Sequence, residues 1–93
     1  MDRLANLRAV GWIKDAKANT LGAEARKAFA DGDWYFVPRL KSPATAHQLS
    51  GNIGDWTMML EAISKAGWVL QHWSVTQDRH GRPEAYPLFV RRQ

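Results

Sequence analysis

Two strand-like segments near the end of the chain constrain its fold more than any other feature. Residues 68–76 and 84–91 are rich in aromatic and β-branched side chains, and a turn with Gly81 separates them. This pattern predicts an antiparallel hairpin. Large apolar side chains alternate onto opposite faces of each strand, as in the pairs Trp68 and Trp73, and Tyr86 and Phe89. A strand that is apolar on both faces must be covered on both.

The chain has one sharply amphipathic helix, which can cover only one face of a sheet. In the helix expected at 55–66, a single apolar stripe is formed by Trp56, Met59, Leu60 and Ile63. Asn52 or Asp55 is expected to cap its start, and Gly67 to end it. The second sheet face is then covered either by residues 1–17 or by another copy of the chain.

A second helix is expected further towards the N-terminus. Its apolar positions repeat with helical spacing over residues 21–31, with Thr20 or Asn19 as the cap. Gly32 lies just beyond its end, where a left-handed residue commonly stops a helix. Residues 1–20 form either a further helix or an arm.

The sequence therefore predicts a small α+β fold. The aromatic run 34–38 adds a strand, which gives a three-stranded, mainly antiparallel sheet with strands at 34–38, 68–76 and 84–91, packed with helices near 21–31 and 55–66. We expect one domain, residues 1–93. The last strand is placed in the middle of the sheet, because this position buries Leu88 and Phe89 most fully.

The residue types needed for catalysis or metal binding do not form a recognisable pattern. The chain has no cysteine, and the spacing of His47, His72 and His80 fits no metal-site template. No nucleophile motif or phosphate-binding loop is present. We therefore predict no catalytic residue, no cofactor and no metal site. A small-ligand enzyme that uses His72 is the third functional hypothesis.

The formal net charge of +4 permits an acidic partner such as nucleic acid. Two clusters could contact phosphates, namely Arg79 with Arg82 in the hairpin turn and Arg91 with Arg92 at its end. Trp73 and Tyr86 are candidate stacking platforms beside them. Nucleic-acid binding as an accessory protein is accordingly the second functional hypothesis.

The first hypothesis is a non-enzymatic interaction domain that self-associates as a homodimer. The aromatic side chains left uncovered by one helix would meet a second copy, and the interface candidates are Trp68, Trp73, Tyr86 and Phe89. The first residues are too polar for a secretory signal, and no run of about 18 apolar residues exists. We therefore expect a cytoplasmic protein without a membrane partner.

The C-terminal two-thirds also resembles a group of known domains. The stretch from Asp33 to Arg92 contains Gly67-Trp68-Val69-Leu70-Gln71-His72-Trp73 and Gly81-Arg82-Pro83-Glu84-Ala85-Tyr86-Pro87-Leu88-Phe89. It is similar to small uncharacterised bacterial domains of actinobacteria and phages, which have a strand, a helix, a Gly-Trp strand and a final hairpin ending in Phe-x-Arg. The resemblance implies a small α+β fold with its core at 33–92. It carries over no activity and no functional residue.

Overall fold

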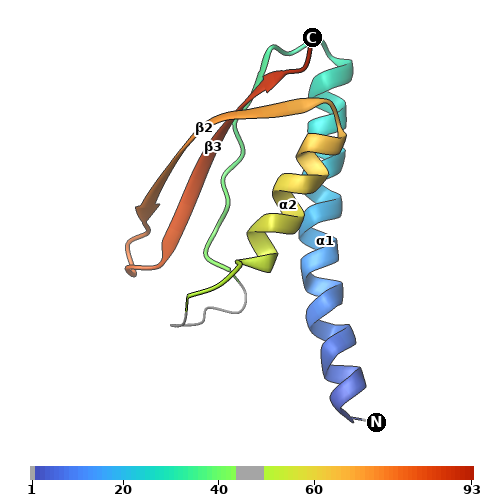
Figure 1. The fold of residues 1–93 in the computed structure, drawn as a ribbon, viewed down its shortest axis with the longest axis vertical. Coiled ribbons are helices and arrows are strands. Elements are labelled where there is room, and N and C mark those ends of the chain that lie inside the picture. The colour runs from blue at the N-terminus through green and yellow to red at the C-terminus, as the bar shows by residue number, and fades with distance from the viewer. Residues whose placement is uncertain (1, 44–49) are drawn as a thin grey trace.

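The computed structural model describes residues 2–43 and 50–93, with residues 2–15 described as backbone. The elements are α1 (Asp2–Ala30), β1 (Tyr35–Phe36), α2 (Gly54–Lys65), β2 (Trp68–Gln77) and β3 (Pro83–Arg91). Two helices and a three-stranded antiparallel sheet confirm the predicted α+β fold (Figure 1).

The first helix is one continuous element, and its predicted start near Thr20 is wrong. α1 runs from Asp2 without a break at Gly11, because one internal glycine costs a helix only about 1 kcal/mol. The Thr20 hydroxyl donates to the carbonyl of Ala16, 2.9 Å away, instead of capping a helix start. The N-terminal half of α1 extends past the start of α2 (Figure 1).

Both helices end at a glycine, as the sequence predicts. Gly32 has a φ of 87°, and backbone bonds from Gly32 to Phe29 and from Asp33 to Ala28 close the end of α1. Gly67 ends α2 with a φ of 108°. A Cβ atom there would lie 2.6 Å from the Phe29 ring, so Gly67 also permits close packing of the two helix ends.

The start of α2 differs from the expected cap. Neither Asn52 nor Asp55 occupies the N-cap position, which Ile53 holds without a side-chain hydrogen bond. Asn52 instead accepts a hydrogen bond from the Thr57 hydroxyl at 2.7 Å. Asp55 lies in the first turn of α2, where the helix dipole favours a carboxylate, and it is bound by Lys17 of α1 at 3.0 Å.

The sheet has the order β1-β3-β2, so the last strand is in the middle, as predicted. β1 opposes β3 through Tyr35 with Val90 and Phe36 with Phe89. The same register continues to a bridge between Leu40 and Ala85. It places Pro38 opposite Pro87, and neither residue has a backbone N–H to donate. The prolines thus explain why β1 is short although the extended chain continues beside β3.

The core lies between the sheet and the helices and is centred on Trp68. Its ring packs edge-on against Phe29 and stacks on Phe36, with both centroid distances 5.7 Å. The indole N–H donates to the carbonyl of Ala25 in α1 at 2.9 Å. Ile63 of α2 and Phe89 of β3 complete this fully buried cluster. The predicted packing of Trp68 against the end of α2 is therefore confirmed.

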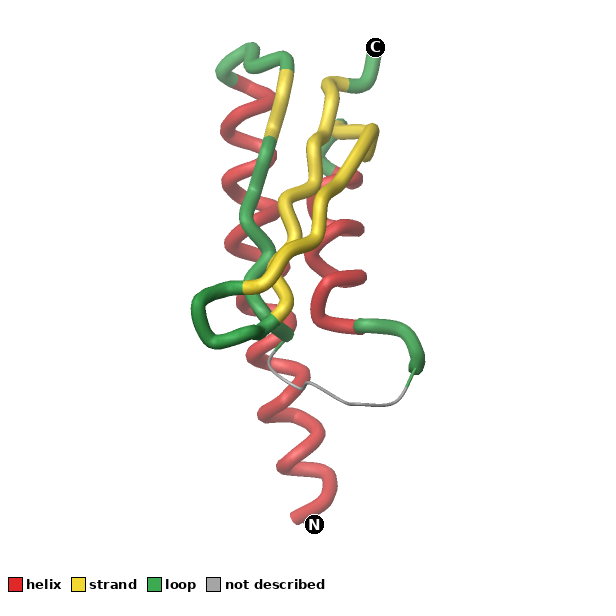
Figure 2. The backbone as a smooth tube through the Cα atoms, turned by 90° about the vertical axis from the view of Figure 1, so that its left-hand side faces the viewer, coloured by secondary structure: helices red, strands yellow, loops and turns green. Residues whose placement is uncertain are grey.

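Both helices lie on the same face of the sheet. Figure 2 shows the strands in front of α1 and α2, and no described helix lies on the near side of the sheet. Ala85, Pro87 and Phe89 are the buried residues of β3 and point to the helices, while the alternating residues between them are only half-buried. Residues 2–17 therefore do not cover the second face.

Within the described residues, no helix combines the length and hydropathy that a bilayer-spanning segment needs.

Candidate functional site

Strand β2 forms an edge of the sheet along its whole length. Its ten residues pair with β3 on one side, and no described strand pairs with it on the other. Every residue of β2 after Trp68 is exposed. The strand contains no Lys, Arg, Asp, Glu or Pro. Such residues usually protect a sheet edge from pairing with another chain, so most of this edge is chemically unprotected.

A bulge in β2 changes which side chains share a face. The pairing with β3 shifts between Leu70 and His72, so Gln71 is an extra residue in the ladder. After the bulge, Trp73 lies opposite Pro87 on the helix-facing side. The sequence pattern placed Trp73 on the opposite face from Trp68, and this prediction is wrong because a bulge reverses the alternation.

The outer edge of β2 presents a row of apolar side chains. Leu70, Trp73 and Val75 lie on the helix-facing side but are not fully covered by the helices, and they remain 42%, 42% and 55% exposed. The Trp73 ring lies edge-on to the ring of Trp56 in α2, with their centroids 6.1 Å apart. Val69 projects from the other face and is also exposed. An edge that is both unpaired and apolar is suited to binding another protein strand.

The second face of the sheet carries a different set of residues. From Tyr35 to Lys41, exposed and less exposed residues alternate at every position. Phe36, Pro38 and Leu40 point to the helices. Tyr35, Val37, Arg39 and Lys41 consequently point to the uncovered face. We refer to this uncovered side, together with Tyr86, Leu88 and Val90 of β3, as the open face.

The interface candidates from the sequence lie in three different environments. Trp68 and Phe89 are fully buried in the core, so they have no surface to offer a partner. Trp73 is on the exposed edge. Tyr86 is half-buried on the open face, where its hydroxyl donates to the Glu84 carboxylate. This hydrogen bond raises the pKa of the Tyr86 hydroxyl above its ordinary value.

The four arginine candidates are likewise separated by the fold. Arg91 is used internally, because its guanidinium lies 3.9 Å from the centre of the Phe29 ring and donates to the carbonyls of Phe29 and Asp33. Arg92 is exposed at the same end of β3. Arg79 and Arg82 are exposed in the hairpin turn, at the opposite end of the sheet.

Asp78 organises that hairpin turn. Its carboxylate accepts hydrogen bonds from the backbone N–H groups of His80 and Arg82 and from the Arg82 guanidinium, at 2.8 to 2.9 Å. The backbone bond from Arg82 is the main reason that the pKa of Asp78 lies below its ordinary value. Asp78 therefore fixes the turn backbone and the side chain of Arg82.

The histidines do not come together in the described part of the chain. His72 is exposed on β2, His80 is exposed in the hairpin turn, and His47 lies outside the described residues. Among the residues that the structure describes, no group of three His, Asp or Glu side chains could hold a metal ion.

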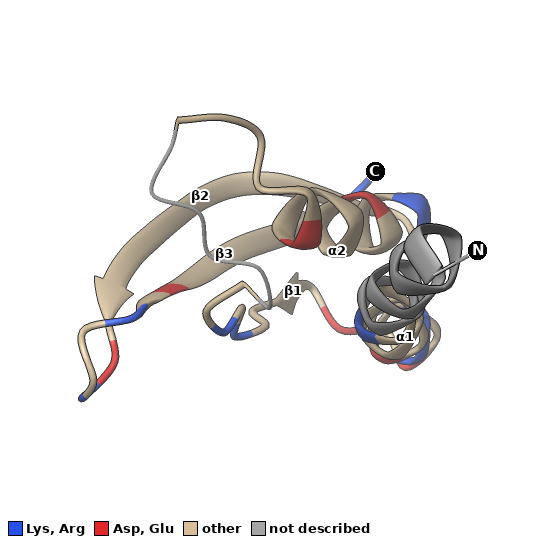
Figure 3. Ribbon diagram, turned by 90° about the horizontal axis from the view of Figure 1, so that it is seen from below, with Lys and Arg blue, Asp and Glu red and all other residues tan. Residues whose placement is uncertain are grey.

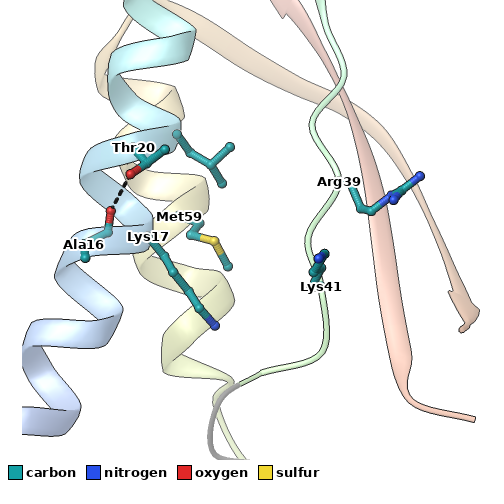
Figure 4. A pocket seen from close by; sticks show the side chains of 7 residues that line it. Ala16, Lys17, Thr20, Arg39, Lys41 and Met59 are labelled. Atoms are coloured by element: carbon teal, nitrogen blue, oxygen red, sulfur yellow. Dashed lines mark hydrogen bonds between the residues drawn. The ribbon is translucent and has the colours of Figure 1, made fainter. Parts of the chain in front are cut away.

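A hollow of about 410 Å³ lies between the helices and the segment after β1. Leu21 and Met59 supply its apolar wall, and Lys17 crosses it towards the buried Asp55 (Figure 4). Arg39 also lines the hollow, but its side chain points away from Lys17 towards β3 (Figure 4). The ion pair of Lys17 with Asp55 joins α1 to α2, which gives this region a structural role.

Comparison with known proteins adds no assignment: no family model, no curated protein and no solved structure matches the chain. The resemblance to small bacterial domains of unknown function therefore remains a prediction.

Proposed function

We propose that this protein is a self-associating interaction domain and that two copies pair through the outer edges of their β2 strands. The observation that carries the proposal is the outer edge of β2, with which no described strand pairs and which has nine exposed residues and no Lys, Arg, Asp, Glu or Pro. A homodimer is the expected assembly.

The geometry of an edge favours pairing with an identical strand. Antiparallel pairing of β2 with its copy is generated by a two-fold axis perpendicular to the sheet. Because β2 carries no charged side chain, the copies meet without like-charge repulsion. The helices of both copies then lie on one side of a continuous sheet, and the two open faces lie on the other.

Side-chain burial supplies the stabilising free energy of this arrangement. The bulge at Leu70 and His72 interrupts regular pairing, so a ladder is expected mainly over residues 72–77. Within that range Trp73 and Val75 would bury their exposed apolar surface against the second copy. A stable contact should bury at least about 1,200 Å² in total.

Analytical ultracentrifugation over a range of protein concentrations tests the proposal. The wild-type protein should sediment as a dimer of twice the chain mass of 10.5 kDa at high micromolar concentration. Val75→Lys should weaken the dimer by at least about 2 kcal/mol, or about 30-fold in Kd, because it buries a charge in the paired edge.

The chain offers a closely matched control for that variant. Val37 is 58% exposed, against 55% for Val75, but it lies on the open face beside β1. Val37→Lys should therefore leave the dimer intact. A wild-type monomer at high micromolar concentration, or equal dissociation by the two variants, would contradict pairing through β2.

Two further expectations remain predictions under this proposal. A cytoplasmic location fits an interaction domain of this composition, and cell fractionation of the tagged protein would check it. The hypothesis of an enzyme that uses His72 stays in third place, because His72 is exposed on β2 and lines neither the hollow between the helices nor the hollow at the hairpin turn.

A further inference from the structure

The open face gathers cations that are far apart in the sequence. The bridge between Leu40 and Ala85 sets Arg39 beside Tyr86 and Lys41 beside Glu84, because antiparallel partners keep the same register. The Arg39 guanidinium indeed lies 5.7 Å from the centre of the Tyr86 ring. Leu40 is fully buried on the helix side, so its two charged neighbours project from the open face.

The hairpin turn brings further cations to the same place. Arg39, Lys41, Arg79 and Arg82 line one hollow of about 720 Å³ at this end of the sheet. Two carboxylates, those of Asp78 and Glu84, also line it, so the four cations are in excess. Figure 3 shows the charged hairpin turn and the segment after β1 at this end of the sheet, with α1 on the far side of α2. A hollow with this charge balance attracts phosphate groups.

We propose that this hollow and the adjoining open face bind single-stranded nucleic acid. Arg39, Lys41 and Arg79 contact the phosphates, while Tyr35 provides a stacking surface for a base. The site differs from the one expected from sequence, because Arg91 is held by Phe29 and Arg39 and Lys41 take its place. Every residue belongs to one chain, so binding does not depend on dimer formation.

The shape of the surface favours a single strand over a duplex. Tyr35 is 62% exposed and lies opposite Val90, four residues along β3 from Tyr86. The two tyrosines are therefore separated by about 13 Å along the sheet. Val37 and Leu88 lie between them on an apolar surface that suits unstacked bases, which a duplex does not present. The phosphates then run from this surface into the cationic hollow.

Fluorescence anisotropy with a labelled oligo-dT and a labelled oligo-U tests this proposal. The wild-type protein should bind both at about 50 mM salt and lose affinity steeply by about 200 mM. The double variant Arg39→Gln with Lys41→Gln should flatten the slope of log affinity against log salt by about 0.7 for each phosphate that the variant no longer neutralises. Tyr35→Ala should weaken binding by about fivefold or more while leaving that slope unchanged.

A matched control removes the same charge elsewhere. Arg26 and Lys65 are exposed on α1 and α2, away from the open face, so Arg26→Gln with Lys65→Gln should retain the wild-type slope. Thermal unfolding of each variant checks that its fold is intact.

Three results would overturn the proposal. They are no binding to either oligonucleotide at low salt, equal effects of the two double variants, and competition by a duplex or inorganic polyphosphate as effective as that by the single strand. The Val75→Lys monomer should still bind, so failure of dimer formation and failure of nucleic-acid binding give different results.

Discussion

Trp68 and Trp73 belong to the same strand, lie on the same face of the sheet and have different roles. Trp68 is fully buried, stacks on Phe36, packs edge-on against Phe29 and donates a hydrogen bond to the carbonyl of Ala25 in α1. Trp73 is 42% exposed and packs edge-on against Trp56. The two helices bury the first residue of β2 and leave the rest of the strand exposed. Trp68 therefore stabilises the fold, whereas the exposed residues of β2 after it are available to a partner.

Removing each tryptophan in turn gives the largest expected difference. Trp68→Ala should lower the free energy of unfolding by about 3–5 kcal/mol, because it leaves a cavity among Phe29, Phe36 and Ile63. Trp73→Ala should cost only about 1 kcal/mol, mainly because it removes the edge-on ring packing against Trp56. Chemical unfolding at low protein concentration measures both without a contribution from self-association. Equal losses would contradict the division of β2 into a buried first residue and an exposed remainder.

A pair of glycines extends this comparison to the backbone. Gly67→Ala should destabilise the protein by about 3 kcal/mol for two reasons. The added Cβ atom would clash with the Phe29 ring, and alanine would have to adopt a positive φ. In Gly32→Ala the added Cβ atom would have no neighbour within 4 Å, so only the positive φ is unfavourable. This variant should lose about 1–2 kcal/mol of unfolding free energy. Thermal unfolding of the two variants checks the order. A reversed order would show that Gly67 does not mark a tightly packed junction.

The smallest expected effect lies in the exposed hairpin turn. The pKa of Asp78 is below its ordinary value of 3.8 in the folded protein, so its charged form is favoured by folding. This contribution is complete above the pKa of the unfolded chain and is lost as the pH falls through the folded pKa. Unfolding of the wild type and of Asp78→Asn should therefore differ at neutral pH and converge in acid. A difference that grows in acid would contradict the role of the Asp78 carboxylate.

Much of the fold follows from local patterns in the sequence. The hairpin, the Gly67-Trp68 step and the stop at Gly32 are each specified by neighbouring residues. The central position of the last strand follows from burial of Phe89. The start of α1 was mispredicted, because good capping residues at Asn19 and Thr20 are also tolerated inside a helix that continues through them.

The candidate sites were harder to predict, because they depend on pairing between distant segments. A bulge shifted the register and moved Trp73 to the other face, and nothing local marks a bulge at Gln71. Arg39 and Lys41 were missed because Pro38 indicated the end of a strand. The alternation of Arg39, Leu40 and Lys41 was an available signal for continued extended chain. Only the register with β3 shows that Arg39 and Lys41 line the same hollow as Arg79.

The most direct test of the central claim is hydrogen–deuterium exchange of β2 at low and high protein concentration. We predict that the amides of residues 72–77 that point to the outer edge exchange more slowly as concentration rises, because they become hydrogen-bonded to a second copy. Amides of residues 34–37, near the opposite edge, should exchange at the same rate throughout. Concentration-independent exchange along β2, in a protein that sediments as a monomer, would contradict pairing through this edge.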